Sequence, residues 1–209
     1  SMVMGYAGQI EANESLPESE RKKAQIIRRQ SIKIKNLIND LNLASKLEYN
    51  MQPMDPRPVN LIAIARQSVV DFINSDMEEK YPIEWKTDDT LTACIIKGDR
   101  ELLRRAIGNL ITNSQAHNPD GCTIFVWVEK SAAEYKIIVE DNGVGVTDEK
   151  LEQLRTAPHY MMSDGKTAEP RHGLGLLIVG QIVSAHKGTV SFDHGKHGGF
   201  AVTIAFPII

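Results

Sequence analysis

The most regular hydrophobic pattern of the chain lies in its first fifty residues. Between residues 24 and 47, the apolar residues that recur at intervals of seven are Ile27, Ile34 and Leu41. This spacing places their side chains on one stripe of an α-helix, as is typical of a helix that packs against other helices. Basic residues occupy many of the remaining positions, and we interpret them as a solvated face rather than a partner site.

Local signals indicate where this long helix begins. Ser15 and Glu18 have the spacing of a capping box, and Pro17 suits the first turn of a helix, so we expect the helix to begin near Ser15. A shorter helical segment over residues 3–12 precedes it. Together these segments predict a helical hairpin over residues 1–52, followed by a proline-rich linker at residues 53–58.

From residue 59 onward, short alternating segments and longer helical segments follow one another. Helices are expected over residues 61–75, 100–117, 148–154 and 174–185. Strands are expected over residues 83–85, 92–96, 123–128, 135–140, 189–193 and 200–206. Several of these strands are joined as hairpins. The pattern therefore predicts an α+β fold for residues 59–209, a two-layer sandwich in which helices cover one face of a mixed sheet.

Candidate chemistry begins on the helix expected over residues 100–117. Asn109 and Asn113 are four residues apart, so both amides lie on one face of the helix and can reach a single ligand or metal ion. Further along, an alternating strand ends at Asp141. Its carboxylate can accept a hydrogen bond from an exocyclic amine.

Two glycine clusters follow, Gly143-x-Gly145 directly after Asp141 and Gly173-x-Gly175 at the start of an apolar helix. Glycine lets the backbone approach a phosphate, and a helix N-terminus attracts an anion. The first pair alone could be an ordinary turn. The order of amide helix, acidic strand end and two glycine clusters favours a nucleotide site. The clusters match neither a P-loop nor a dinucleotide fingerprint, because the required lysine and third glycine are missing.

These motifs resemble the ATP-binding domain of sensor histidine kinases, which has the Bergerat fold of the GHKL superfamily. The resemblance covers roughly residues 59–209 and includes the glycine pair at Gly198 and Gly199. The superfamily also contains type II topoisomerases, heat-shock chaperones and mismatch-repair ATPases, in which a water-activating Glu usually stands at the position of Asn109. An amide cannot act as that general base, so the sequence favours phosphoryl transfer over hydrolysis.

The resemblance implies ATP and Mg²⁺ as cofactors. It assigns the adenine amine to Asp141, Mg²⁺ to Asn113 with help from Asn109, and adenine stacking to His117. The other residues expected at the nucleotide are Gly143, Gly145, Arg171, His172, Gly173, Leu174, Gly175, Leu176 and Gly199, with Arg171 chosen as a cation available near the phosphates. A long loop over residues 155–171 is expected to act as a lid over the triphosphate.

The first fifty residues resemble the dimerisation hairpin that precedes this domain in sensor kinases. The acceptor histidine of that hairpin is missing. All six histidines lie in the nucleotide-binding half, at His117, His159, His172, His186, His194 and His197. We therefore expect a truncated hairpin and a fragment that cannot autophosphorylate. In the full-length protein the resemblance implies a homodimer, transfer to a histidine outside this fragment, and transfer from there to an aspartate of a response regulator.

Departures from the family pattern keep two alternatives open. Ala116 and His117 stand where many kinases carry Lys and Tyr, and Phe200 stands where Thr is common. A catalytically silent nucleotide-binding scaffold is therefore one alternative. An anti-sigma-type serine kinase is the other, although such kinases usually lack the helical hairpin that the seven-residue pattern predicts.

Composition narrows the classes of partner. The chain of 209 residues carries 24 Lys and Arg against 27 Asp and Glu, which gives no signature of nucleic-acid binding. Cys94 and Cys122 are far apart and suggest reduced thiols rather than a disulfide or a metal site. No apolar run is long enough to cross a membrane. We expect a cytoplasmic domain whose parent protein is membrane-anchored only through segments absent here.

Overall fold

The structure is a computed structural model that describes residues 2–49, 51–75, 79–156 and 174–208. The chain divides into two compact units, Ser1–Ser45 and Lys46–Ile209, and the division falls within the second helix. In the described ranges, no helix has both the length and the apolar character needed to span a membrane.

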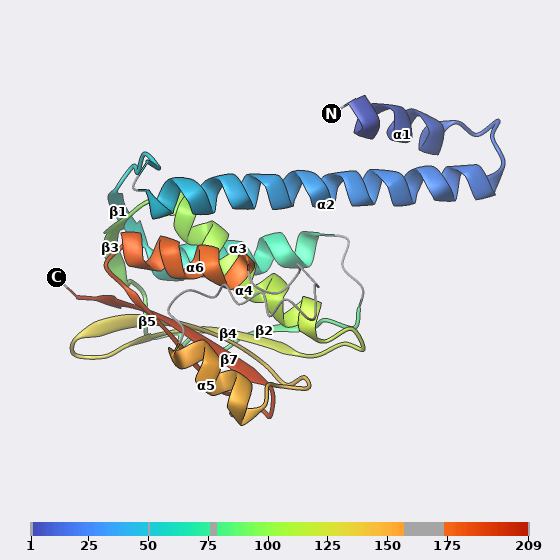
Figure 1. Ribbon diagram of the computed structural model, residues 1–209. Helices are drawn as coiled ribbons and strands as arrows, with labels where there is room; N and C mark the ends of the chain where they lie inside the picture. The colour runs from blue at the N-terminus through green and yellow to red at the C-terminus, as the bar shows by residue number, and fades with distance from the viewer. Residues whose placement is uncertain (1, 50, 76–78, 157–173, 209) are drawn as a thin grey trace. The chain divides into compact units, whose positions relative to one another are not determined.

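The first unit is a helical hairpin made of α1 (Met2–Ala12) and most of α2 (Glu18–Glu48) (Figure 1). Asn13 organises the turn, since its Oδ1 accepts hydrogen bonds from the Ser15 N–H (3.0 Å) and hydroxyl (2.6 Å). The helix begins at Glu18, three residues later than the capping-box pattern predicts, because the Ser15 side chain faces back toward Asn13. An ion pair of 2.7 Å between Arg28 and Glu11 links the two helices.

A five-stranded mixed sheet forms one layer of the second unit, with the order β2-β4-β5-β7-β6. Strand β2 pairs in parallel with β4, and the other neighbours are antiparallel. The strands are β2 (Ile83–Trp85), β4 (Ile124–Lys130), β5 (Glu134–Asp141), β6 (Thr189–His194) and β7 (Phe200–Pro207). All five lie close to the ranges that the sequence predicts.

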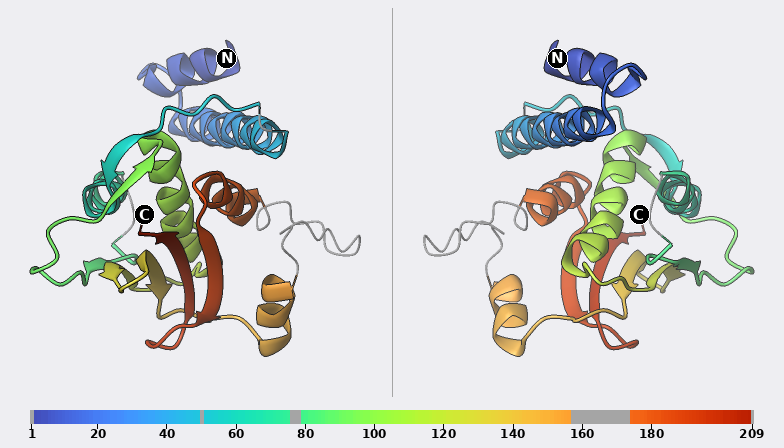
Figure 2. Two further views of the ribbon diagram at one scale, coloured as in Figure 1. Left: turned by 90° about the vertical axis from the view of Figure 1, so that its left-hand side faces the viewer. Right: turned by 90° about the vertical axis from the view of Figure 1, so that its right-hand side faces the viewer.

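Three helices pack together on one face of this sheet, as Figure 2 shows. They are α3 (Leu61–Asn74), α4 (Arg100–His117) and α6 (Leu174–Ala185). The core between the layers contains fully buried aliphatic side chains, among them Ile107 of α4, Ile178 of α6 and Ile137 of β5. The short helix α5 (Asp148–Thr156) lies beside β6. The predicted two-layer α+β sandwich is confirmed.

A second, two-stranded sheet is absent from the sequence-based prediction. Strand β1 (Arg57–Asn60) pairs antiparallel with β3 (Ile95–Gly98), so part of the expected linker is a strand, and the strand expected at residues 92–96 lies slightly later. Pro58 argues against a strand when the sequence is considered alone, yet it is tolerated in this small sheet. Asn60 ends β1 and caps α3, accepting a hydrogen bond from the Ile62 N–H at 3.1 Å.

Candidate functional site

Helix α4 carries the predicted amide pair. Asp99 caps the helix, and its Oδ1 accepts hydrogen bonds from two backbone N–H groups, those of Glu101 (3.0 Å) and Leu102 (3.1 Å). The apolar positions of α4 are buried in the core, which leaves Asn109 and Asn113 half-buried at its margin. The Asn109 amide Nδ2 lies 3.5 Å from the Gly175 carbonyl oxygen, so the structure brings α4 next to the start of α6.

Asp141 is the last residue of β5, and only 3% of its surface is exposed. Its Oδ1 accepts a hydrogen bond from the Gly143 N–H at 3.0 Å and a longer one from the Phe200 N–H at 3.4 Å. Within the described residues its Oδ2 has no hydrogen-bond partner. Burial, and next the negative charge of Asp141, raise the pKa of the Cys122 thiol to about 11. The site thus contains a buried carboxylate with one oxygen available to a ligand.

Glycines surround this carboxylate because no side chain fits there. A Cβ at Gly199 would overlap the Asp141 carbonyl oxygen and Oδ1, and a Cβ at Gly143 would overlap the Asn118 amide. Gly145 has a φ of 65°, in the left-handed region that favours glycine. The structure therefore brings the predicted residues Gly143, Gly145 and Gly199 together around Asp141.

Asn118 is a structural element of the site that sequence reasoning missed. The side chain is buried, donates from Nδ2 to the Ser114 carbonyl at 2.7 Å, and accepts at Oδ1 from the Val144 N–H at 2.9 Å. It thereby fastens the first glycine cluster to the end of α4. The Tyr81 hydroxyl also donates to the Asn118 carbonyl at 3.0 Å. The local signal in the sequence is an Asn-Pro pair after a helix, and such a pair is typical of a turn.

The second glycine cluster is described only in part. Helix α6 begins at Leu174, as predicted, and its first backbone N–H groups have no intrahelical acceptor. Leu174 and Gly175 are half-buried and Leu176 is buried. The predicted residues Arg171, His172 and Gly173, and most of the loop predicted as a lid, lie outside the described residues.

His117 and Phe200, two departures from the family pattern, have different environments. His117 is the exposed last residue of α4, at the end that leads into Asn118. Phe200 is buried, and its ring stacks with the Phe192 ring at a centroid distance of 6.0 Å. The Phe200 ring is therefore part of the packing between β6 and β7, while its backbone N–H faces Asp141.

His186, directly after the C-terminus of α6, contacts the N-terminus of α4. Its Nε2 accepts a hydrogen bond from the Asp99 N–H at 2.9 Å, and its Nδ1 lies 2.7 Å from the Ile182 carbonyl oxygen. These contacts require a neutral ring with the proton on Nδ1. Burial lowers the pKa of His186, which favours the same form. Asp99 also accepts a hydrogen bond at Oδ2 from the Asp55 N–H at 3.0 Å, which connects the segment before β1 to this junction.

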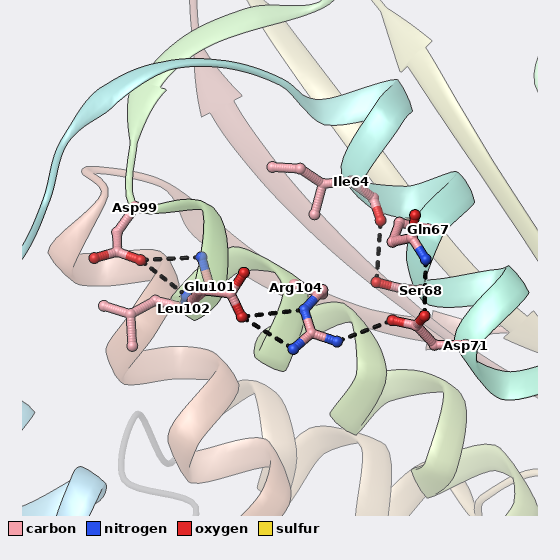
Figure 3. A network of polar contacts seen from close by, with 8 residues as sticks. All are labelled: Ile64, Gln67, Ser68, Asp71, Asp99, Glu101, Leu102 and Arg104. Carbon is pink, nitrogen blue, oxygen red and sulfur yellow. Dashed lines mark hydrogen bonds and ion pairs between the residues drawn. The ribbon is translucent and has the colours of Figure 1, made fainter. Parts of the chain in front are cut away.

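A groove of about 510 Å³ lies between α3 and α4, away from Asp141. Figure 3 shows its polar network, in which Arg104 contacts both Asp71 and Glu101 at 2.9 Å. The pKa of the Asp71 carboxyl is lowered, mainly by the hydrogen bond from Gln67. Burial opposes this shift, and the contact with Arg104 adds to it. Because two carboxylates already engage Arg104, we do not assign it to a phosphate.

Comparison with known proteins identifies relatives of the chain. Residues 98–209 match the family described as histidine kinase-, DNA gyrase B-, and HSP90-like ATPase. Sensor histidine kinase YvrG of Bacillus subtilis is 28% identical over 208 residues, which is 99% of this chain and 35% of that protein. BaeS of Escherichia coli, a signal transduction histidine-protein kinase, is 24% identical over 172 residues, or 82% of this chain and 36% of that protein. The chain thus spans about a third of the length of these curated relatives.

Solved structures share the fold. Full-length ShkA in complex with AMPPNP superimposes with a TM-score of 0.73 at 22% identity, covering 98% of this chain and 42% of that one. The histidine kinase AdeS of Acinetobacter baumannii gives a TM-score of 0.67 at 19% identity, covering 99% and 93%. At these identities the likeness concerns the fold alone.

Proposed function

The chain belongs to the family of histidine kinase-, DNA gyrase B-, and HSP90-like ATPases, and from this premise we propose that it is the ATP-binding kinase portion of a two-component sensor histidine kinase. The observation that carries the proposal is the buried Asp141 carboxylate, which has one oxygen free and is enclosed by glycines beside a helix with two aligned amides.

Adenine recognition falls to Asp141 in this proposal. Its free Oδ2 accepts a hydrogen bond from the exocyclic amine, while Oδ1 stays bound to backbone N–H groups. The absence of side chains at Gly143, Gly145 and Gly199 lets the backbone of both glycine segments pack closely around Asp141 and hold its carboxylate in place. His117, exposed at the end of α4, supplies a ring for stacking on the base.

Asn113, with Asn109, would hold Mg²⁺ at the phosphates. The donor set fits this ion, because amide oxygens are hard ligands and Mg²⁺ usually keeps several waters while using few protein groups. A dedicated cage is not available in the described ranges, where no three His, Cys, Asp or Glu side chains cluster as ligands. When bound, the ion would neutralise phosphate charge. Asn109 also contacts the first turn of α6, whose N–H groups would face the phosphates.

The remaining phosphate contacts belong to the start of α6 and the residues before it. We assign Arg171 and His172 to the phosphates and the backbone of Gly173, Leu174, Gly175 and Leu176 to their cradle. The charge of Arg171 and the dipole of α6 would both stabilise the transferred phosphoryl group.

We assign the reaction to phosphoryl transfer, because the Asn109 amide cannot activate water as a general base. The acceptor is a histidine outside these 209 residues, and an aspartate of a response regulator receives the group next. Relatives named as histidine kinases support this choice over an anti-sigma-type kinase or a silent scaffold.

The long helix α2 would provide the dimer contact of the full-length protein. The residues of its seven-residue pattern are exposed in the described hairpin, at 50% for Ile27, 57% for Ile34 and 61% for Leu41. Burying such a stripe against a second copy would remove apolar surface from water. Cytoplasmic location and a membrane anchor elsewhere in the parent protein complete the proposal.

Calorimetric titration of a non-hydrolysable ATP analogue tests the site. The native chain should bind it more tightly with Mg²⁺, and Asp141→Asn should weaken binding by about tenfold or more, because the amide places a donor where the adenine amine needs an acceptor. Asp120→Asn, at an exposed turn position, is the matched control and should bind normally. Equal affinity of the Asp141→Asn variant and the native chain would contradict the proposed pose.

A further inference from the structure

Glu140, the neighbour of Asp141 in β5, is a buried carboxylate that the proposed mechanism does not use. Only 2% of its side chain is exposed. Successive residues of a strand face opposite sides of the sheet, so Glu140 and Asp141 point away from each other. A buried charge requires compensating donors. The structure supplies them from the turn between β6 and β7, residues 195–199.

His197 provides both donors to this carboxylate. Its backbone N–H donates to Glu140 Oε1 at 2.7 Å, and its ring Nδ1 lies 2.7 Å from the same oxygen. Since an ionised carboxylate only accepts, Nδ1 carries the proton. The His197 ring also stacks on Phe125, the strand partner of Glu140, at a centroid distance of 4.0 Å. The ring therefore has one bonding and one stacking contact that fix the turn.

The same turn forms one wall around Asp141. The Gly195 N–H donates to the Gly199 carbonyl at 2.8 Å and closes the turn. Gly199 lies against the Asp141 backbone and carboxylate, and the Phe200 N–H is 3.4 Å from Asp141 Oδ1. The turn thus contacts two consecutive residues of β5, with His197 on Glu140 and Gly199 on Asp141.

We propose that Glu140 and His197 are positioning residues that set the base selectivity of the nucleotide site by holding the 195–199 turn against Asp141. The inference rests on the proposed role of Asp141. A carboxylate held in one orientation presents an acceptor to the amine of adenine and repels the carbonyl oxygen that guanine carries at that position. Without the His197 contacts the turn loosens, Asp141 gains rotational freedom, and discrimination between the bases falls.

The test compares the affinities of non-hydrolysable ATP and GTP analogues for the full 209-residue chain by calorimetry. His197→Ala should reduce the ratio of the two affinities by about tenfold, the effect of losing one charge-assisted hydrogen bond. His194→Ala is the matched control, because His194 is in the same hairpin but pairs with the exposed Asp148. It should keep the ratio within about twofold of the native value.

Rescue by a conservative variant separates positioning from general damage. Glu140→Gln keeps an oxygen that accepts from His197 and should hold the ratio within about threefold, whereas Glu140→Ala removes the acceptor of both donors and should lose at least as much as His197→Ala. A His197→Ala variant with native selectivity, or a Glu140→Gln variant as impaired as His197→Ala, would overturn the inference alone. A native chain that binds neither analogue would overturn the proposed function as well.

Discussion

The adenine end and the phosphate end of the proposed site are built by different means. At the adenine end, Asp141 is buried and held by backbone donors, and Asn118 ties the adjoining loop to α4. At the phosphate end, α4 packs against α6, and the described hydrogen bond from Asn109 to the start of α6 is long, at 3.5 Å between half-buried groups. We therefore expect base recognition to use geometry that exists before the nucleotide binds.

Replacing a glycine by alanine at each end of the proposed site should give the largest difference in the free energy of unfolding. Gly199→Ala places a Cβ into the Asp141 carbonyl and carboxylate, so it should destabilise the fold by about 3 kcal/mol and abolish analogue binding. Gly175→Ala meets no atom within 4 Å and removes a glycine from α6, so it should raise stability by up to about 1 kcal/mol. Urea unfolding of both variants measures the contrast, and equal losses would contradict it.

Asn118→Ala tests the support of the adenine end. The change leaves the buried Ser114 carbonyl without its side-chain donor and the Val144 N–H without its acceptor, so the free energy of unfolding should fall by about 2 kcal/mol. Binding of the ATP analogue should weaken as the glycine cluster loses its attachment to α4.

Asn74→Ala, at an exposed position that ends α3, provides the control. It should leave both stability and analogue affinity close to the native values. A native-like affinity in the Asn118→Ala variant would show that the glycine cluster keeps its position without this amide.

The pH dependence of the free energy of unfolding tests the contact between His186, after α6, and the Asp99 N–H, before α4. Burial lowers the pKa of His186 below its ordinary value of 6.5, so the folded chain favours the neutral ring. Its contribution should be fully present above pH 6.5 and should be lost as pH falls through the lowered folded pKa. Urea midpoints of the native chain and of His186→Gln, compared between about pH 7.5 and about pH 5.5, measure this difference.

The His186→Gln variant should lose less stability than the native chain on acidification, because glutamine does not titrate. Parallel curves for the two chains would mean that His186 binds the same number of protons in the folded and unfolded states. The predicted effect is smaller than those of the glycine and asparagine substitutions, because acidification affects only one hydrogen bond, from the Asp99 N–H to His186 Nε2.

Local patterns predicted much of this molecule. The helices at residues 100–117 and 174–185 match their predicted ranges, because apolar residues at helical spacing are also the residues that the core buries. The mixed sheet and the covering helices follow from the same alternation. The motifs also indicated Asp141 and the glycines next to it. Where a Cβ would overlap another residue, only glycine fits, and the sequence shows that glycine directly.

Contacts between distant segments escaped prediction. Strand β1 forms by pairing with β3, almost forty residues away, despite Pro58. Asn118 has the context of a turn residue, yet its amide binds the Val144 N–H. His197 is an exposed hairpin residue, as its position between glycines suggests, but its partner Glu140 was not predicted. The side chains alone do not specify such partners, because polar residues are compatible with both solvent and a buried bond.

The sequence by itself therefore determined most of the elements, the layer that covers the sheet and the types of residue at the proposed nucleotide site, because periodicity and glycine placement are local properties. Only the tertiary structure decided how the site is held. Three contacts join segments that are distant along the chain. Asn118 binds the first glycine cluster, the 195–199 turn binds β5, and His186 binds the Asp99 N–H. Their energies arise from burial and hydrogen-bond geometry that exist only once the chain has folded.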